Sequence, residues 1–189
     1  MFSILSKHNI FQIIARLVSI IPNLRKGTTK ANPPPYVGMK NVAFFNKREV
    51  AMGETPSGAV SSSARSLAKI GAVMAGRGVW EGEQVIGASG WSAIHGAPKK
   101  ASMIMGETDF TQGGVHRFQT SVDSSKTSQA FNGGREGFYG WMGLGGSIFQ
   151  WHPEHEIGFA YVPTSLNILD LFNERGKSYQ AEVLKCLQQ

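Results

Sequence analysis

The chain has 189 residues and a formal net charge of +6 at neutral pH, with 41% hydrophobic and 17% charged residues. These proportions are typical of a folded globular protein and exclude a disordered chain. The basic residues are scattered singly or in pairs rather than gathered in a run, so we predict no nucleic-acid-binding surface. The single cysteine, Cys186, excludes an internal disulfide, and we expect its side chain to be buried.

The N-terminal residues 1–31 combine an amphipathic helix, expected over 9–21, with a basic segment. Charged residues interrupt the apolar ones, and no run reaches the ~20 apolar residues that span a bilayer. The segment contains no acidic residue, so a mitochondrial presequence is one interpretation. The favoured interpretation is a helix packed on the body of a cytoplasmic protein. Residues 32–40 contain Pro33, Pro34 and Pro35 and are predicted to form an extended connector.

Residues 41–189 are predicted to form one further domain that begins with short elements. Residues 41–50 favour a strand or turn that buries Phe44 and Phe45. A helix is expected from about Ser63 to Ala75, ended by glycines, and a short helix over about 87–95. Residues 101–118 predict a strand, a turn and a strand.

The second half of this domain predicts a hairpin followed by a helical end. Residues 121–137 read as a polar loop, and residues 138–162 predict paired antiparallel strands on either side of the turn "HPEH". A closing helix is expected to begin at about 164, to be broken at Gly176 and to resume over 178–187. The fold class predicted is α+β, with an antiparallel sheet flanked by helices.

The first candidate for chemistry is Ser66-x-x-Lys69, which has the spacing of the nucleophile motif in serine β-lactamases and penicillin-binding proteins. The helical pattern places both residues off the apolar face. A lysine on a solvated face keeps its proton and cannot act as a base. We therefore expect an exposed helix face here rather than a catalytic pair.

Other partial matches carry less weight. Lys126-Thr127-Ser128 lies in the polar loop, and Ser165-x-Asn167 fits a helix cap. His152 and His155 lie among carboxylates at the expected hairpin turn, where polar residues are usual, and no second ligand cluster accompanies them. We predict no metal site and no cofactor.

The least ordinary stretch is "GWMGLGGS" at 140–147, with four glycines in eight residues inside a strand context. Two interpretations stay open from the residues alone. The glycines could let a ligand approach free backbone N–H groups, which could stabilise an oxyanion. They could equally belong to a bulged, tightly packed strand.

Several segments resemble serine β-lactamase-related proteins, which include class C β-lactamases, penicillin-binding proteins and esterases. The resemblance lies in residues 44–50, 54–86, 110–114 and 138–164, in family order, and is closest to the lactamase-like proteins of animals. It implies the C-terminal portion of a β-lactamase/transpeptidase-like fold, and an ancestry in serine hydrolases that act on β-lactams, peptides or esters.

The resemblance also implies that this chain lacks the family's catalytic residues. The family's nucleophile Ser-x-x-Lys and its Tyr-x-Asn would lie upstream of every matched segment. Where the family has Lys-Thr-Gly or His-x-Gly, this chain has Trp141-Met142-Gly143, and the N–H of Leu144 would match an oxyanion-hole donor. We therefore assign no catalytic residue and take these four residues as candidates for substrate or oxyanion binding.

The resulting expectation is a truncated β-lactamase-related protein that is inactive by itself. One alternative is a non-catalytic binding module that reuses the sheet. Another is an active esterase in which Ser66 is the nucleophile. The expected partners are a small ester or amide ligand, another copy of the chain, or a partner chain.

Overall fold

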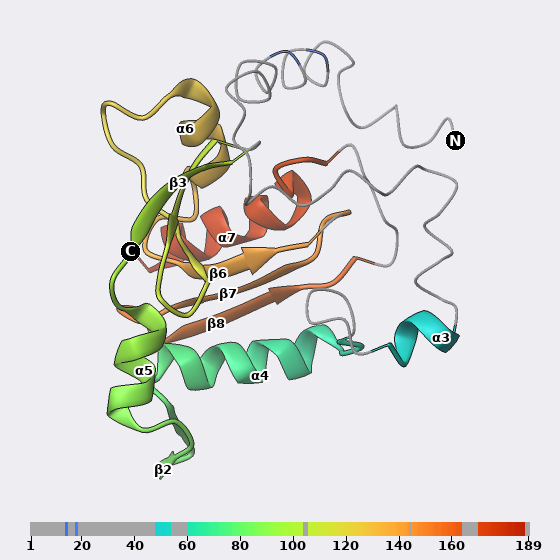
Figure 1. Cartoon of the computed structure of the whole chain (residues 1–189), viewed down its shortest axis with the longest axis vertical. Helices are drawn as coiled ribbons and strands as arrows, with labels where there is room; N and C mark the ends of the chain where they lie inside the picture. Colours follow the sequence, from blue (N-terminus) through green and yellow to red (C-terminus); the bar gives the residue numbers. More distant parts are fainter. Residues whose placement is uncertain are drawn as a thin grey trace.

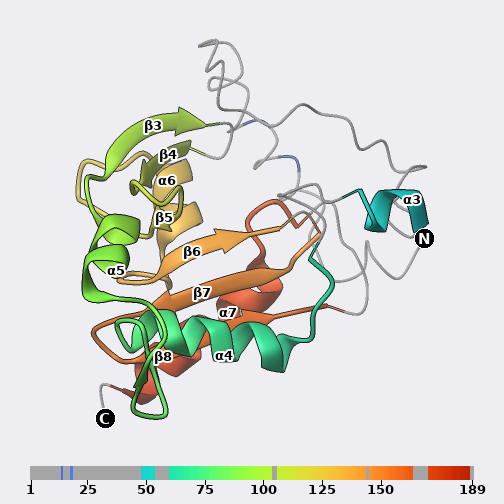
Figure 2. The ribbon, with the colours of Figure 1, turned by 60° about the horizontal axis from the view of Figure 1, so that its bottom comes forward.

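A computed structural model describes residues 14, 18, 48–53, 60–103, 106–143, 145–163 and 170–187. At its centre lies an antiparallel sheet (Figure 1), whose strands follow one another in chain order, β3-β4-β5-β6-β7-β8 (Figure 2). Helices cover this sheet, so the α+β class is confirmed. The predicted segments 1–31 and 32–40 lie outside the described residues, except for positions 14 and 18, which are helical and exposed.

The strands of the sheet are β3 (Lys99–Met103), β4 (Gly106–Phe110), β5 (His116–Arg117), β6 (Tyr139–Met142), β7 (Ile148–His152) and β8 (Ile157–Tyr161). A separate hairpin consists of β1 (Val79–Trp80) and β2 (Glu83–Gln84). The helices are α3 (Arg48–Ala51), α4 (Ala64–Ala75), α5 (Ala88–His95), α6 (Lys126–Asn132) and α7 (Glu174–Cys186). None of the helices in the described ranges is long and apolar enough to cross a membrane.

The sheet separates two apolar clusters. In Figure 2 helix α4 lies in front of the sheet and α7 lies behind it. Helix α4 crosses β7 and β8 on one face, and its Met74 and Ala75 are buried with Trp151. On the other face α6 and α7 cover a larger core of Phe118, Phe131, Phe138, Met142, Ile148 and Phe172. The paired antiparallel strands predicted for residues 138–162 are confirmed, and the chain turns at 153–156 between β7 and β8. The expectation of one strand before this turn is wrong, because the glycine-rich residues 143–147 divide that stretch into β6 and β7, which pair with each other.

Helix α4 lies unusually close to the sheet because glycine faces glycine. A Cβ built on Gly71 would lie 3.1 Å from the Cα of Gly158 in β8. A Cβ on Gly158 would in turn meet the backbone of α4 at Ala72 and Ala68. The helix begins where expected, because the Ser63 side chain accepts a hydrogen bond from the Ser66 N–H and so caps the first turn.

Two predictions made for loops and strands are wrong. The polar loop contains helix α6, which Ser125 caps through the Ser128 N–H at 3.1 Å and which buries Phe131 in the core. A helix of seven residues with so little apolar content has no detectable periodicity. Residues 48–51 form helix α3 rather than a strand or turn, and Phe44 and Phe45 lie outside the described residues.

The C-terminal helix also differs from the prediction. Helix α7 starts at Glu174 and runs through Gly176 without a break. A Cβ at Gly176 would meet Ile148 Cδ1 and the Tyr161 ring, so the residue is glycine because the helix packs closely on the sheet. Cys186 is exposed at the end of α7, so its predicted burial is wrong.

The half-buried imidazole of His95 bridges two tryptophans, Trp91 of α5 and Trp151 of β7. His95 Nδ1–H donates to the Trp91 carbonyl at 2.8 Å, and its Nε2 accepts from Trp151 Nε1–H at 2.8 Å. The ring stacks on Trp91 with centroids 3.9 Å apart. This arrangement needs the neutral imidazole, because a second N–H would face the Trp151 donor. Burial lowers the pKa of His95, and the bond to Trp91 offsets part of this effect.

We expect stability to fall as the pH drops below the ordinary histidine value of 6.5. Burial lowers the pKa of His95, His116 and His152 in the folded protein, so the unfolded chain binds more protons in this window. Each histidine therefore lowers the stability progressively from this value until the pH passes its folded pKa. Stability is fully retained above the window.

The local readout is tryptophan fluorescence during a pH titration of the folded protein. His95→Gln keeps one donor and one acceptor without a titrating group, so it should remove the part of the fluorescence change that comes from Trp91 and Trp151. Identical titration curves for the variant and the wild type would contradict the role given to His95.

A pair of glycine substitutions tests the packing of α7. Gly176→Ala should lower the free energy of unfolding by about 1–3 kcal/mol, because crowding against Ile148 and Tyr161 outweighs the gain in helix propensity. The matched control is Gly90→Ala in α5, where the new Cβ meets only Ile86 at 3.6 Å. That change should be neutral or stabilise by up to about 1 kcal/mol. Urea unfolding would refute the packing argument if both variants moved in the same direction.

Candidate functional site

The candidate residues predicted from the sequence lie at the end of β6. Trp141 is half-buried, and its ring lies 5.5 Å from that of Phe110 and 6.4 Å from that of Phe131. Met142 is buried, and its sulfur lies 3.2 Å from the Nη1 donor of Arg135. Trp141 and Met142 therefore make aromatic and core contacts, and neither brings the positive charge that the family has at this point.

The chain turns directly after Met142, and the turn uses its own polar groups. The Gly143 N–H donates to the Ser147 carbonyl at 2.8 Å, and the Gly146 N–H donates to the Gly143 carbonyl at 3.3 Å. Because the Gly143 N–H is engaged in this way, it is no free donor for an oxyanion. Leu144, the fourth candidate, lies outside the described residues.

Two side chains from the start of α7 hold this glycine turn, defined here as residues 143–147. The Asn173 amide Nδ2 donates to the carbonyls of Gly143 and Ser147, each at 3.0 Å. Arg175 Nη2 donates to the Gly145 carbonyl at 2.6 Å. Three carbonyls of the turn therefore receive hydrogen bonds from the helix start.

The same contacts explain the glycines. Gly146 has a φ of +115°, and a Cβ there would lie 2.6 Å from Arg175 Nη2. A Cβ at Gly143 would meet the Ser147 hydroxyl. Of the two interpretations left open by the sequence, these observations favour the tightly packed strand end over a cradle for a ligand.

Ser66 and Lys69 both lie exposed on α4, as expected. The Ser66 hydroxyl lies 3.0 Å from the hydroxyl of Ser63, within the helix cap. Lys69 Nζ lies 5.9 Å from the centre of the Trp80 ring, in a cation–π contact. Each side chain thus has a separate partner. Ser165 and Asn167 lie outside the described residues, and Lys126-Thr127-Ser128 forms the first turn of α6 rather than a loop.

The histidine pair lies at the end of β7. The His152 and His155 rings are 4.3 Å apart between centroids, and the His155 N–H donates to His152 Nδ1 at 3.3 Å. Burial lowers the pKa of His152, and the nearby His155 lowers it further. Within the part of the chain that the structure describes, no group of three or more metal-ligating side chains occurs.

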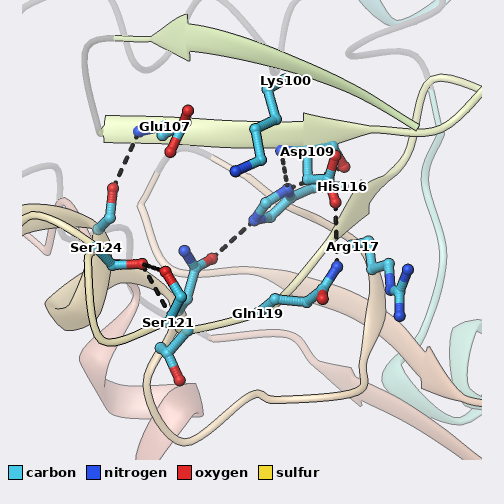
Figure 3. A pocket seen from close by; sticks show the side chains of 11 residues that line it. Lys100, Glu107, Asp109, His116, Arg117, Gln119, Ser121 and Ser124 are labelled. Atoms are coloured by element: carbon cyan, nitrogen blue, oxygen red, sulfur yellow. Dashed lines mark hydrogen bonds between the residues drawn. The ribbon is translucent and has the colours of Figure 1, made fainter.

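A pocket that the sequence did not reveal lies between β3, β4, β5 and α6 (Figure 3). Its volume is about 140 Å³. In Figure 3 Lys100 reaches from β3 toward the middle of the pocket, and Ser121 and Ser124 lie across from it. The lining is polar and consists of Lys100, Glu107, Asp109, His116, Arg117, Gln119, Thr120, Ser121, Ser124, Ser128 and Asn132.

The buried wall of this pocket is a hydrogen-bonded His–Asn pair. His116 Nδ1 accepts from the Asp109 N–H at 3.0 Å, so the neutral ring carries its proton on Nε2. Nε2–H then donates to Asn132 Oδ1 at 2.8 Å. Burial lowers the pKa of His116, which favours this neutral ring. The pair fixes the Asn132 amide, and its Nδ2 donor makes no hydrogen bond with any described residue.

The sequence did contain a signal for this pocket. Glu107 and Asp109 are two residues apart in β4 and therefore lie on the same face of the strand. The other lining residues come from β3, β5, α6 and the loop before α6, and they meet only because the strands pair in chain order. Helix α6 forms one side of the pocket, and the sequence analysis did not predict this helix.

The glycine turn should loosen when Asn173 is changed. Asn173 has a φ of +52°, so Asn173→Gly keeps the backbone conformation and removes only the side-chain donor. We expect a loss of about 1–3 kcal/mol because the Gly143 and Ser147 carbonyls lose a partner. Asn173→Ala should cost about 1–2 kcal/mol more through backbone strain. Faster hydrogen exchange at the Gly143 amide is the local readout, and a glycine variant as stable as the wild type would contradict it.

Comparison with known proteins returned no matching family model, no matching curated protein and no matching solved structure. The β-lactamase resemblance therefore rests on the quoted residues, and the arguments below rest on this chain's own geometry.

Proposed function

We propose that this chain is a β-lactamase-related protein of serine hydrolase ancestry that does not carry out acyl transfer by itself. The order of the resembling segments supports the ancestry. The antiparallel sheet flanked by helices is compatible with it. A small ester or amide ligand, self-association, a partner chain and a cytoplasmic or mitochondrial location stay predictions.

One observation carries the proposal: the nucleophile and base of an acyl-transfer site do not come together among the described residues. Acyl transfer needs a nucleophile, a base within hydrogen-bond reach and oxyanion donors in one cleft. Ser66 and Lys69 are exposed and contact Ser63 and Trp80 respectively. The Gly143 N–H is bonded within its turn, and the candidate donor Leu144 lies outside the described residues.

The test is hydrolysis of a chromogenic cephalosporin and of p-nitrophenyl acetate by the purified chain, next to Ser66→Ala. Equal background rates are expected for both proteins, because an exposed serine without a base is not activated. Ser62→Ala is the matched control, since Ser62 is exposed just before the same helix. A rate well above background that Ser66→Ala abolishes and Ser62→Ala preserves would overturn the proposal and favour the esterase alternative.

The second candidate function is a non-catalytic binding module. The polar pocket beside α6 favours it, because the pocket presents a buried amide donor and charged side chains without partners. This site differs from the glycine turn that the resemblance singles out.

A further inference from the structure

The pocket beside α6 carries two positive and two negative side chains, and no ion pair among the described residues neutralises any of them. Lys100 on β3 and Glu107 on β4 also make no side-chain hydrogen bond with a described residue, so these two charges are open to a ligand. The other two side chains keep their charge but have contacts of their own. The Asp109 carboxylate accepts from Gln119 Nε2 at 3.1 Å, and the Arg117 guanidinium lies 5.9 Å from the centre of the Tyr139 ring.

The third open group is the buried amide of Asn132. This side chain is only 3% exposed, and His116 holds its oxygen, so Nδ2 is the atom left to donate. This donor is not among the fully buried side-chain atoms that lack a hydrogen bond, so it faces the pocket and can donate to a ligand there. The hydroxyls of Ser121 and Ser124 bond to each other at 2.9 Å and can still donate or accept at the same wall.

The charges select the class of ligand. A simple anion would be attracted by Lys100 but repelled by Glu107 and Asp109, and a simple cation would be repelled by Lys100 and Arg117. A zwitterion satisfies both open charges at once and adds no net charge. Charge-assisted hydrogen bonds to an ammonium and to a carboxylate are the strong kind.

The pocket is partly open, so its volume indicates how large a molecule it can enclose. A cavity of about 150 Å³ holds a molecule as large as benzene, which has six heavy atoms. This pocket has about 140 Å³. The α-amino acids of that size are glycine and alanine, and serine is slightly larger. All carry an ammonium and a carboxylate on one carbon.

We propose that the pocket between β3, β4, β5 and α6 binds a small free α-amino acid. Lys100 and the Asn132 amide hold the carboxylate, and Glu107 holds the ammonium. The inference rests on the second proposed function, the binding module, and is independent of acyl transfer.

The test is calorimetric titration of the purified chain with L-alanine and glycine, beside acetate and ethylamine as the two half-ligands. We expect binding at millimolar ligand or below, with each half-ligand at least about tenfold weaker, because it leaves one charge unpaired. Amide NMR shifts should locate the ligand at Lys100 and at residues 107–132.

Two exposed positions supply the variants. Lys100→Met and Glu107→Gln should each weaken L-alanine binding about tenfold or more. Lys99→Met and Glu83→Gln are the matched controls and should bind as the wild type does. Lys99 precedes Lys100 on β3 and points to the opposite face, and Glu83 lies on the separate hairpin. Asn132→Ala is less suitable, since it also unpairs His116.

The inference is overturned if no amino acid binds, if acetate binds as tightly as L-alanine, or if Lys100→Met and Glu107→Gln bind like their controls. The same preparations separate the two proposals. Turnover of the chromogenic substrates would reject the acyl-transfer proposal alone, whereas absent amino-acid binding without turnover would reject this inference alone.

Discussion

The buried guanidinium of Arg135 is the constraint on which the α7 side of the molecule depends. The residue is 0% exposed and is surrounded by the main aromatic core. Its Nη1 donates to the Phe131 carbonyl at the end of α6, and its Nη2 donates to the Phe172 carbonyl at 2.5 Å, just before α7. Burial lowers its pKa to about 10, and the carboxylates of Glu174 and Asp170 counter this effect, so the group stays charged at neutral pH. A charge buried this deeply destabilises the fold strongly if its partners are lost.

Arg135 also helps to fix the position of the glycine turn that follows β6. Arg135 Nη2 also reaches the Asn173 carbonyl at 3.3 Å, and the Asn173 side chain holds the glycine turn. Asp170 accepts from the Glu174 N–H at 2.7 Å and so completes the start of α7. A series of hydrogen bonds therefore runs from Arg135 in the core, through Asn173, to the glycine turn. The glycines of this turn are needed for close packing. The polar pocket lies on the other side of α6, where the hydrogen-bonding groups are less fully paired.

The sequence predicted the parts of this fold whose signals are local. Helix α4 has a serine cap, an apolar stripe and terminal glycines, and β7 and β8 are apolar stretches on either side of a polar turn. The prediction of secondary structure failed where a contact with a distant part of the chain determines the local structure. Gly176 looks like a helix breaker in the sequence, but the structure shows that the packing of Ile148 and Tyr161 requires a glycine there. Helix α6 is stabilised by Phe131, which packs into a core formed by residues of other elements. The pocket was missed for the same reason, since its walls come from four separate elements.

The order of the strands has a consequence for how the chain folds. Each strand of the sheet pairs with the next one in sequence, so the sheet can grow by closing short loops one after another. Such local pairing gives a low contact order and favours rapid folding for a sheet protein. The docking of α4 on β8 is different, because it brings together Gly71 and Gly158, which are far apart in the sequence, with almost no space between the two backbones. Contacts of this kind raise the contact order, so α4 adds a slower, long-range element to a sheet whose own pairings are local.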